Sequence, residues 1–232
     1  MTIAIMQPYI FPYIGYFQLI NAVDKFIIYD DVNFINKGWI NRNNILVSGQ
    51  SHLFTIPLKD ASQNKLINEV ALLKGEPWQK KFLKTLQQSY QKAPYYQKVF
   101  VLIEEIVNLD VQTIYELTFQ ALKRTCEYME ITTEIVPSST IYQNTHLKGP
   151  ERILDICKQE KASHYINPIG GMELYDKEKF EKEGIKLDFI KSVSSPYTQF
   201  KNAFVPWLSI IDILMFNGPE DIKEHLKAYE LI

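Results

Sequence analysis

Short apolar runs alternate with amphipathic stretches over the first part of the chain. The apolar run at 3–7 is too short for a helix and predicts a buried strand. Residues 16–23 carry apolar side chains at helical spacing, and the β-branched run at 25–29 predicts a second strand. Because a helix commonly connects two parallel neighbours, these residues predict a βαβ unit.

The middle of the chain has a different pattern. Residues 45–58 predict a hairpin, and residues 67–73 predict a further strand. Three consecutive helices are then predicted at 77–91, 94–107 and 111–129, and a proline opens each of the first two.

Strands and helices alternate again towards the C-terminus. The predicted elements are a strand at 131–136, a helix at 151–160, a strand at 164–167, a helix at 177–182, a strand at 185–190, and helices at 207–216 and 220–228. Such alternation at both ends predicts an α/β fold with an open parallel, Rossmann-like sheet. We expect residues 1–75 and 131–232 to form the N-terminal and C-terminal parts of this α/β domain, with residues 76–130 as a helical insert.

Composition and charge narrow the classes of function. The chain has 232 residues, 46% of them hydrophobic and 22% charged, which is ordinary for a globular protein. Its net charge is -2 and its basic residues are dispersed, so we expect no nucleic-acid partner. No apolar stretch is long enough to span a membrane and no export signal is recognisable, so the predicted location is the cytoplasm.

Histidine and cysteine do not indicate a metal site. The four histidines lack the spacing of metal ligands, and Cys126 and Cys157 lie in helical patterns where cysteine is usually a small core residue. We therefore expect no metal. Walker, nucleophile-elbow and dinucleotide-binding glycine motifs are also absent from the sequence.

The loop after the first predicted strand is the first candidate site, because ligands of open parallel sheets bind outside the carboxyl ends of the strands. A glycine there allows the main chain to approach a ligand, and the free amides of the following helix favour an anion. The residues predicted to bind substrate in this loop are Gln7, Tyr13, Gly15 and Tyr16. A turn whose aromatic side chains fill the core is the structural alternative.

This layout resembles that of nucleotidyltransferases and pantothenate synthetases. In those enzymes the loop carries two histidines around a glycine, whereas Tyr13 and Tyr16 stand at the equivalent positions here. Tyrosine donates hydrogen bonds but does not supply the positive charge that stabilises a phosphoryl transition state. The predicted sheet is therefore nucleotidyltransferase-like without the histidine chemistry.

Two adjacent carboxylates, Asp30 and Asp31, end the second predicted strand and are the predicted catalytic residues. Either could orient or deprotonate an acceptor amine, hold sugar hydroxyls or bind a metal–nucleotide. An Asx turn or a helix cap is the structural alternative.

Polar and aromatic side chains continue into the next loop. Arginine suits phosphate, asparagine suits sugar hydroxyls, and tryptophan offers a stacking surface. The residues predicted to bind substrate here are Asn33, Trp39, Asn41 and Arg42. A solvated loop is the structural alternative.

A second wall of the same cleft is predicted nearer the C-terminus. Lys148 precedes a predicted helix, whose free amides together with the lysine could hold a phosphate. Gly170 and Gly171 follow a predicted strand, where a glycine pair permits close approach of the main chain to a ligand. Tyr175 completes the substrate-binding residues predicted for this wall.

Several segments resemble the WbqC-like protein family. They are residues 7–20, 24–26, 29–34, 39–43, 151–157, 165–167, 170–175 and 205–212. Members of that family are found among bacterial surface-polysaccharide (O-antigen) genes. The resemblance implies transfer of an acyl group, for example an aminoacyl group such as glycyl, to the amine of a nucleotide-linked amino sugar.

The leading hypothesis is therefore an N-acyltransferase whose partners are a nucleotide-linked sugar and an acyl or aminoacyl donor. No cofactor is assigned, although ATP could activate the donor. The alternatives are a non-catalytic nucleotide-sugar binding protein, an ATP-dependent carboxylate–amine ligase or nucleotidyltransferase, and an interaction protein of a polysaccharide assembly complex. A homo-oligomer is compatible with each of these hypotheses.

Overall fold

A six-stranded sheet runs through the middle of the computed structural model, which describes residues 1–75 and 77–232. Its strands are, in spatial order, β10 (Tyr229–Leu231), β9 (Lys186–Ser192), β8 (His164–Pro168), β1 (Thr2–Met6), β2 (Lys25–Ile28) and β7 (Glu134–Val136). All neighbours are parallel except β10, which pairs antiparallel with β9. The predicted open parallel, Rossmann-like sheet is confirmed, whereas the three-residue β10 was not predicted from the sequence.

The strand order has a switch point between β1 and β8. From β1 the chain builds outward through β2 to β7, then returns to the other side of β1 and builds outward through β8 to β9. A crevice forms outside the carboxyl ends of the strands at such a point, and ligands of open α/β sheets bind there.

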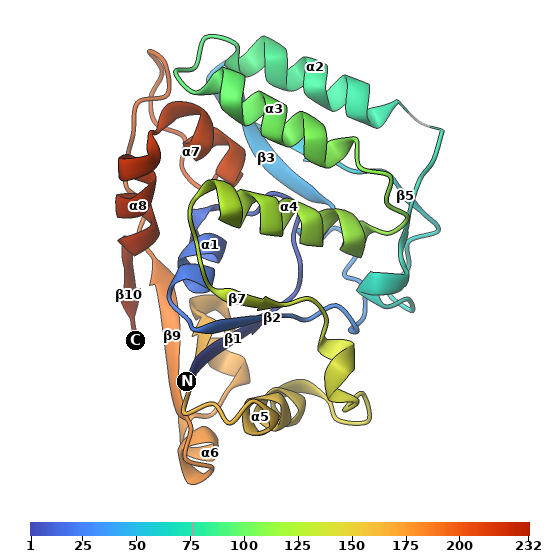
Figure 1. Ribbon diagram of the computed structural model, residues 1–232, viewed down its shortest axis with the longest axis vertical. Coiled ribbons are helices and arrows are strands. Elements are labelled where there is room, and N and C mark those ends of the chain that lie inside the picture. Colours follow the sequence, from blue (N-terminus) through green and yellow to red (C-terminus); the bar gives the residue numbers. More distant parts are fainter. Residues whose placement is uncertain (76) are drawn as a thin grey trace.

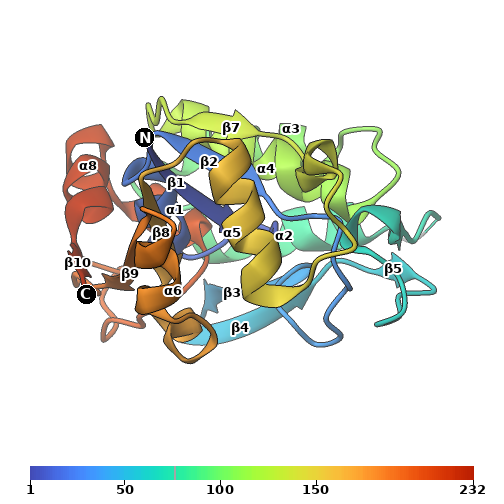
Figure 2. The same cartoon turned by 90° about the horizontal axis from the view of Figure 1, so that it is seen from below.

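Helices cover both faces of the sheet (Figures 1 and 2). One face packs against α1 (Ile14–Asn21), α4 (Ile114–Tyr128) and α8 (Pro219–Lys227), and the other against α5 (Gly149–Gln159) and α6 (Lys177–Lys182). Alternate residues of β1 supply the two cores, with Ala4 in the first and Ile3 and Ile5 in the second. Strands buried on both faces read as continuous apolar runs, which is why they were recognisable in the sequence.

The long connection between β2 and α4 forms an additional layer. It contains the hairpin β3 (Arg42–Val47) and β4 (Gln50–Thr55), the short pair β5 (Leu58–Lys59) and β6 (Ala71–Leu72), and helices α2 (Trp78–Tyr90) and α3 (Tyr96–Val107). The predicted hairpin is confirmed, with its strands a few residues earlier than expected. Ser48 and Gly49 turn it at φ of 51° and 77°, in the left-handed region that such turns require.

The three predicted middle helices are confirmed as α2, α3 and α4. In Figure 1, α4 lies over the sheet, whereas α2 and α3 lie beyond it next to β3. The division of the chain at 76 and 130 stays a prediction.

The strand predicted at 67–73 is wrong for its first part, where a single 3-10 turn spans Ile67–Glu69 before the two-residue β6. The Glu69 carboxylate accepts a hydrogen bond from the Leu66 amide at 2.9 Å, and the Ile67 amide donates to the Val32 carbonyl. These bonds occupy the main-chain groups that the ladder of a strand would need.

Two C-terminal boundaries also differ from the prediction. The segment after β8 forms a 3-10 helix at Ile169–Leu174 rather than an open glycine loop. Helix α7 ends at Phe216 as predicted but begins at Ile210, three residues later than predicted, because Trp207 has a left-handed φ of 61° and Ser209 caps the helix. None of the helices within residues 1–75 and 77–232 is long and apolar enough to cross a membrane.

Candidate functional site

A cavity of about 350 Å³ opens at the carboxyl end of the sheet. Tyr9, Pro12 and Tyr13 reach it from the loop after β1, Ile169 from the segment after β8, and Lys191 and Ser192 from the end of β9. Trp39 comes from the connection between β2 and β3, Asn43 comes from β3 itself, and Trp207 comes from the segment before α7. The cavity therefore lies at the switch point, where the fold favours ligand binding.

Four of the nine residues that line the cavity are aromatic. Trp39 and Trp207 are 47% and 52% exposed, which is unusual for so large an apolar ring. The Tyr13 and Trp207 rings meet edge to face, with their centroids 5.9 Å apart. These surfaces can stack against a flat or ring-shaped ligand.

The backbone at the cavity is strained. Phe11 and Trp207 have left-handed φ values of 41° and 61°, which bulky residues rarely adopt. The Phe11 carbonyl is held by the Asn43 amide nitrogen at 2.8 Å and the Ser209 hydroxyl at 2.7 Å. Strain that the surrounding structure maintains in this way is often found at binding sites.

Gly15 lies directly beneath the ring of Tyr13. A β-carbon at Gly15 would stand 2.6 Å from Tyr13 Cζ and 2.7 Å from its phenol oxygen. The absence of a side chain at Gly15 therefore allows the Tyr13 ring to occupy the cavity wall.

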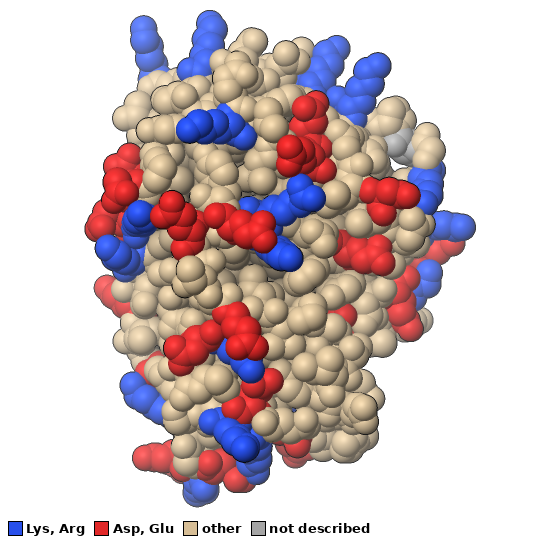
Figure 3. All heavy atoms as spheres, viewed as in Figure 1, with Lys and Arg blue, Asp and Glu red and all other residues tan. Residues whose placement is uncertain are grey.

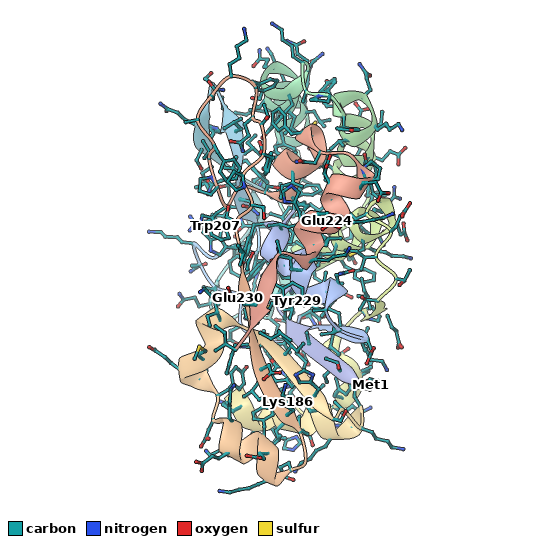
Figure 4. The ribbon with its side chains drawn as sticks, turned by 90° about the vertical axis from the view of Figure 1, so that its left-hand side faces the viewer. Met1, Lys186, Trp207, Glu224, Tyr229 and Glu230 are labelled. Atoms are coloured by element: carbon teal, nitrogen blue, oxygen red, sulfur yellow. The ribbon has the colours of Figure 1, made fainter. Side chains whose placement is uncertain are left out.

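A few polar groups accompany the aromatic rings. Burial raises the pKa of the Tyr13 phenol, which therefore stays protonated and able to donate a hydrogen bond at neutral pH. The ammonium of Lys191 lies 3.6 Å from Glu230 in an exposed pair that contributes little to stability. Figure 4 shows this side of the molecule, with Trp207 beyond the end of β9 opposite to Lys186 and with Glu230 on the neighbouring β10.

The predicted catalytic residues Asp30 and Asp31 lie in a different place. They are 1% and 4% exposed and do not line the cavity. Asp30 Oδ1 accepts hydrogen bonds from the Ser138 hydroxyl at 2.8 Å and the Ser139 amide at 3.0 Å, and Asp30 Oδ2 accepts one from the Asn68 side-chain amide at 3.1 Å. Every oxygen of the Asp30 carboxylate therefore has a partner within the fold.

Asp31 forms a buried ion pair with Arg152 of α5. Arg152 Nη2 lies 2.6 Å from Asp31 Oδ2, and its Nη1 donates to the Asp31 main-chain carbonyl at 3.2 Å. The guanidinium also covers the ring of Tyr29 at 4.9 Å. Sequence reasoning did not identify Arg152, whose buried partner lies far away along the chain. This geometry supports an anchoring role that ties α5 to the end of β2.

Of the residues predicted in the loop after β2, the structure brings only Trp39 to the cavity. The guanidinium of Arg42 donates to the carbonyls of Lys37 and Gly38 and lies 5.8 Å from the Trp39 ring. It therefore holds the loop that presents Trp39.

The remaining polar residues of that region have structural contacts. The Asn41 amide nitrogen donates to the Ile56 carbonyl at 2.8 Å, and Asn33 forms an isolated bridge with Leu66. The phenol of the buried Tyr16 donates to the Gln7 carbonyl at 2.7 Å, so Tyr16 faces the core and not the cavity.

The residues predicted for the second wall are dispersed. Lys148 is exposed at the start of α5. A β-carbon at Gly170 would meet nothing within 4 Å, whereas one at Gly171 would collide with Asn167. Tyr175 packs against Tyr165 and Phe180. The structure brings none of these four predicted residues into the cavity wall, although their neighbour Ile169 lines it.

The sequence contained signals for some of the missed residues. Lys191 and Ser192 lie at the end of β9, where the same strand-end argument applies, but the strand was predicted to stop at 190. Tyr9 belonged to the aromatic loop already under consideration. Trp207 was predicted to be helical, so its exposure was not expected.

Neither the charged side chains on the face shown in Figure 3 nor the metal-ligating side chains among the described residues indicate a second candidate site. Acidic and basic side chains are interspersed on the face that Figure 3 shows. Among the residues that the structure describes, no group of three or more His, Cys, Asp or Glu side chains is arranged to hold a metal ion.

Comparisons with known proteins agree with the resemblance in the sequence. The chain is 29% identical over 232 aligned residues to the uncharacterized protein Rv1507c of Mycobacterium tuberculosis (strain ATCC 25618 / H37Rv). The alignment covers 97% of each of the two chains. No solved structure matches it. The model of the WbqC-like protein family matches residues 7–224. The chain therefore belongs to the WbqC-like protein family.

Proposed function

We propose that the cavity binds a nucleotide-linked amino sugar in the cytoplasm and that the protein transfers an acyl group, such as glycyl, to the amine of that sugar. The observation that carries the proposal is the combination of two exposed tryptophans with one lysine at the switch point of the sheet. Family membership is consistent with this proposal.

The aromatic wall and Lys191 fit the parts of a nucleotide-sugar. Trp39 and Trp207 can stack on a base or on the apolar face of a sugar. The Lys191 ammonium can exchange its exposed partner Glu230 for a phosphate. A volume of about 350 Å³ lies at the lower end of the range for ligand pockets, so the cavity would hold one end of such a ligand.

The reaction we propose uses a preactivated donor such as a thioester. The amine nitrogen forms a bond to the acyl carbon, the carbon–sulfur bond breaks, and the departing thiolate takes the proton from the amine. The Tyr13 phenol is the donor available to the developing oxyanion, since burial raises its pKa and keeps it protonated.

One observation favours a second candidate, a non-catalytic nucleotide-sugar binding protein. Among the described residues that line the cavity there is no carboxylate and no imidazole. Such a lining lacks the usual general base, although a free amine can attack an activated acyl group without one.

Tryptophan fluorescence provides a direct binding test, because two of the three tryptophans line the cavity. In a Trp78→Phe background, titration with UDP-linked and dTDP-linked amino sugars should quench the emission. Trp207→Ala should weaken binding by about tenfold or more, because base or ring stacking contributes about 1–3 kcal/mol. The Trp78→Phe background without the Trp207 substitution is the matched control, and it should bind as tightly as the wild type because Trp78 does not line the cavity. If no nucleotide-sugar binds, the proposal is wrong.

Catalysis is tested separately by mass spectrometry of the nucleotide-sugar. Incubation with an aminoacyl thioester should add the mass of the acyl group to the amino sugar. The same incubation with a free amino acid and ATP tests the ligase. Tight binding without a product in either incubation would favour the binding protein.

A further inference from the structure

Two buried side-chain polar atoms have no hydrogen-bond partner in the part of the chain that the structure describes. They are Ser192 Oγ and Gln18 Oε1. Ser192 lines the cavity, and Gln18 of α1 is only 1% exposed. Because an unpaired buried polar atom costs stability, each such atom needs an explanation.

Gln18 lines a small chamber next to the cavity. The chamber has a volume of about 20 Å³, and Trp207 lines both spaces. Val193, the residue after Ser192, lines the chamber. The Ala228 carbonyl accepts hydrogen bonds from the Gln18 side-chain amide and from the Val193 main-chain amide, each at 2.9 Å. Ser192 and Gln18 are therefore connected through a shared neighbour.

The orientation of the Gln18 amide is fixed. Its nitrogen donates to the carbonyls of His225 at 2.7 Å and Ala228 at 2.9 Å. A flipped amide would turn its oxygen towards two carbonyl oxygens, so Gln18 Oε1 must be the unpartnered atom. That oxygen can only accept, and it needs an N–H or O–H donor from outside the fold.

We propose that this chamber holds the amino group of the transferred acyl group and so selects an aminoacyl donor, whose amino nitrogen donates to Gln18 Oε1. The inference rests on the proposed function. A space of about 20 Å³ suits one small polar group and not an alkyl chain. Ser192 lines the adjoining cavity, and its unpartnered Oγ is then the donor to the carbonyl next to that amine.

The surroundings of the chamber are compatible with an amine. Burial lowers the pKa of His225, which is one of the lining residues, so its ring carries no charge at neutral pH that would repel an ammonium. Ser194 and Ser195 add two hydroxyls. A methyl group in place of the amine would leave Gln18 Oε1 without a partner, and this loss is the basis of the selection.

The test uses glycinamide and propionamide, which differ by an amino group in place of a methyl group. In ¹⁵N–¹H spectra, glycinamide should shift the side-chain amide signals of Gln18 and bind about fivefold or more tightly than propionamide. Ser192→Ala removes a hydroxyl that has no partner in the fold, so it should leave stability intact. It should weaken glycinamide binding about three- to tenfold, as expected for one hydrogen bond.

Two further variants complete the design. Gln18→Met should abolish the preference for glycinamide. This variant also loses the hydrogen bonds to the carbonyls of His225 and Ala228, which can affect folding. Ser192→Ala is therefore the variant that keeps the test independent of folding. Ser89→Ala in α2 is the matched control and should bind both amides as the wild type does.

Equal binding of the two amides, or unchanged glycinamide binding in Ser192→Ala, would overturn the subsite and leave only an ordered water as the partner of Gln18. The same samples are titrated with nucleotide-sugars by tryptophan fluorescence. Quenching by nucleotide-sugars without a preference for glycinamide rejects the subsite alone. A preference for glycinamide without quenching rejects the proposed acceptor and retains the subsite.

Discussion

Gly15 determines where the ring of Tyr13 lies, because its α-carbon stands against that ring. The sequence predicted Gly15 as a place where the main chain approaches a ligand. The structure supports a different reason for the glycine, namely the packing of a cavity side chain on it. A sequence reveals that a glycine is present, but it does not reveal which neighbour needs the space.

Replacing this glycine tests the role of the Tyr13 ring. In Gly15→Ala the new methyl group should push the ring aside and weaken nucleotide-sugar binding about fivefold or more, measured by fluorescence titration. Stability should change little, since alanine gains about 1 kcal/mol in helix propensity and offsets the displacement. Gly170→Ala is the control, because its β-carbon would meet nothing within 4 Å. Equal affinities for the two variants would contradict this role.

At the scale of elements, periodicity predicted most helices and strands, because their apolar residues are close together along the chain. The boundary at Trp207 could not be predicted, since its left-handed backbone depends on contacts with the N-terminal loop. The same limit applies to the strand end at Asp31. Its partner Arg152 is 121 positions away, so the carboxylate appeared to be free for catalysis.

The ion pair between Asp31 and Arg152 should be a strong structural anchor for α5. Arg152→Met should destabilise the protein by about 3–5 kcal/mol, because it leaves a buried carboxylate without its partner. Urea unfolding measures this change. In the double variant Asp31→Leu/Arg152→Met much of the loss should be recovered. If the double variant is as unstable as Arg152→Met, the uncompensated charge is not the cause.

At the scale of the whole molecule, the site joins both ends of the chain. Tyr13 forms a bridge with Ser209, the Ser209 hydroxyl donates to the Phe11 carbonyl, and Gln18 binds the end of α8. The strand-end rule pointed, from the sequence, to the edge of the sheet at which this cavity opens. Which strand ends lie beside one another depends on the strand order, and this order is not encoded in local periodicity.

This closure of the two ends should make stability depend on pH through His225. Burial lowers the pKa of His225 below its ordinary value of 6.5, and nearby Asp221 opposes the shift only in part. The unfolded chain therefore binds a proton more readily than the folded one, so stability is fully present above pH 6.5 and falls as the pH decreases through the lowered value. Urea midpoints measured between about pH 5 and pH 8 should show this loss.

His225→Gln should reduce the slope of the unfolding free energy against pH by up to the equivalent of one proton, whereas His52→Gln on the exposed face of β4 should leave this slope unchanged. An unchanged slope in His225→Gln would assign the acid sensitivity to other groups.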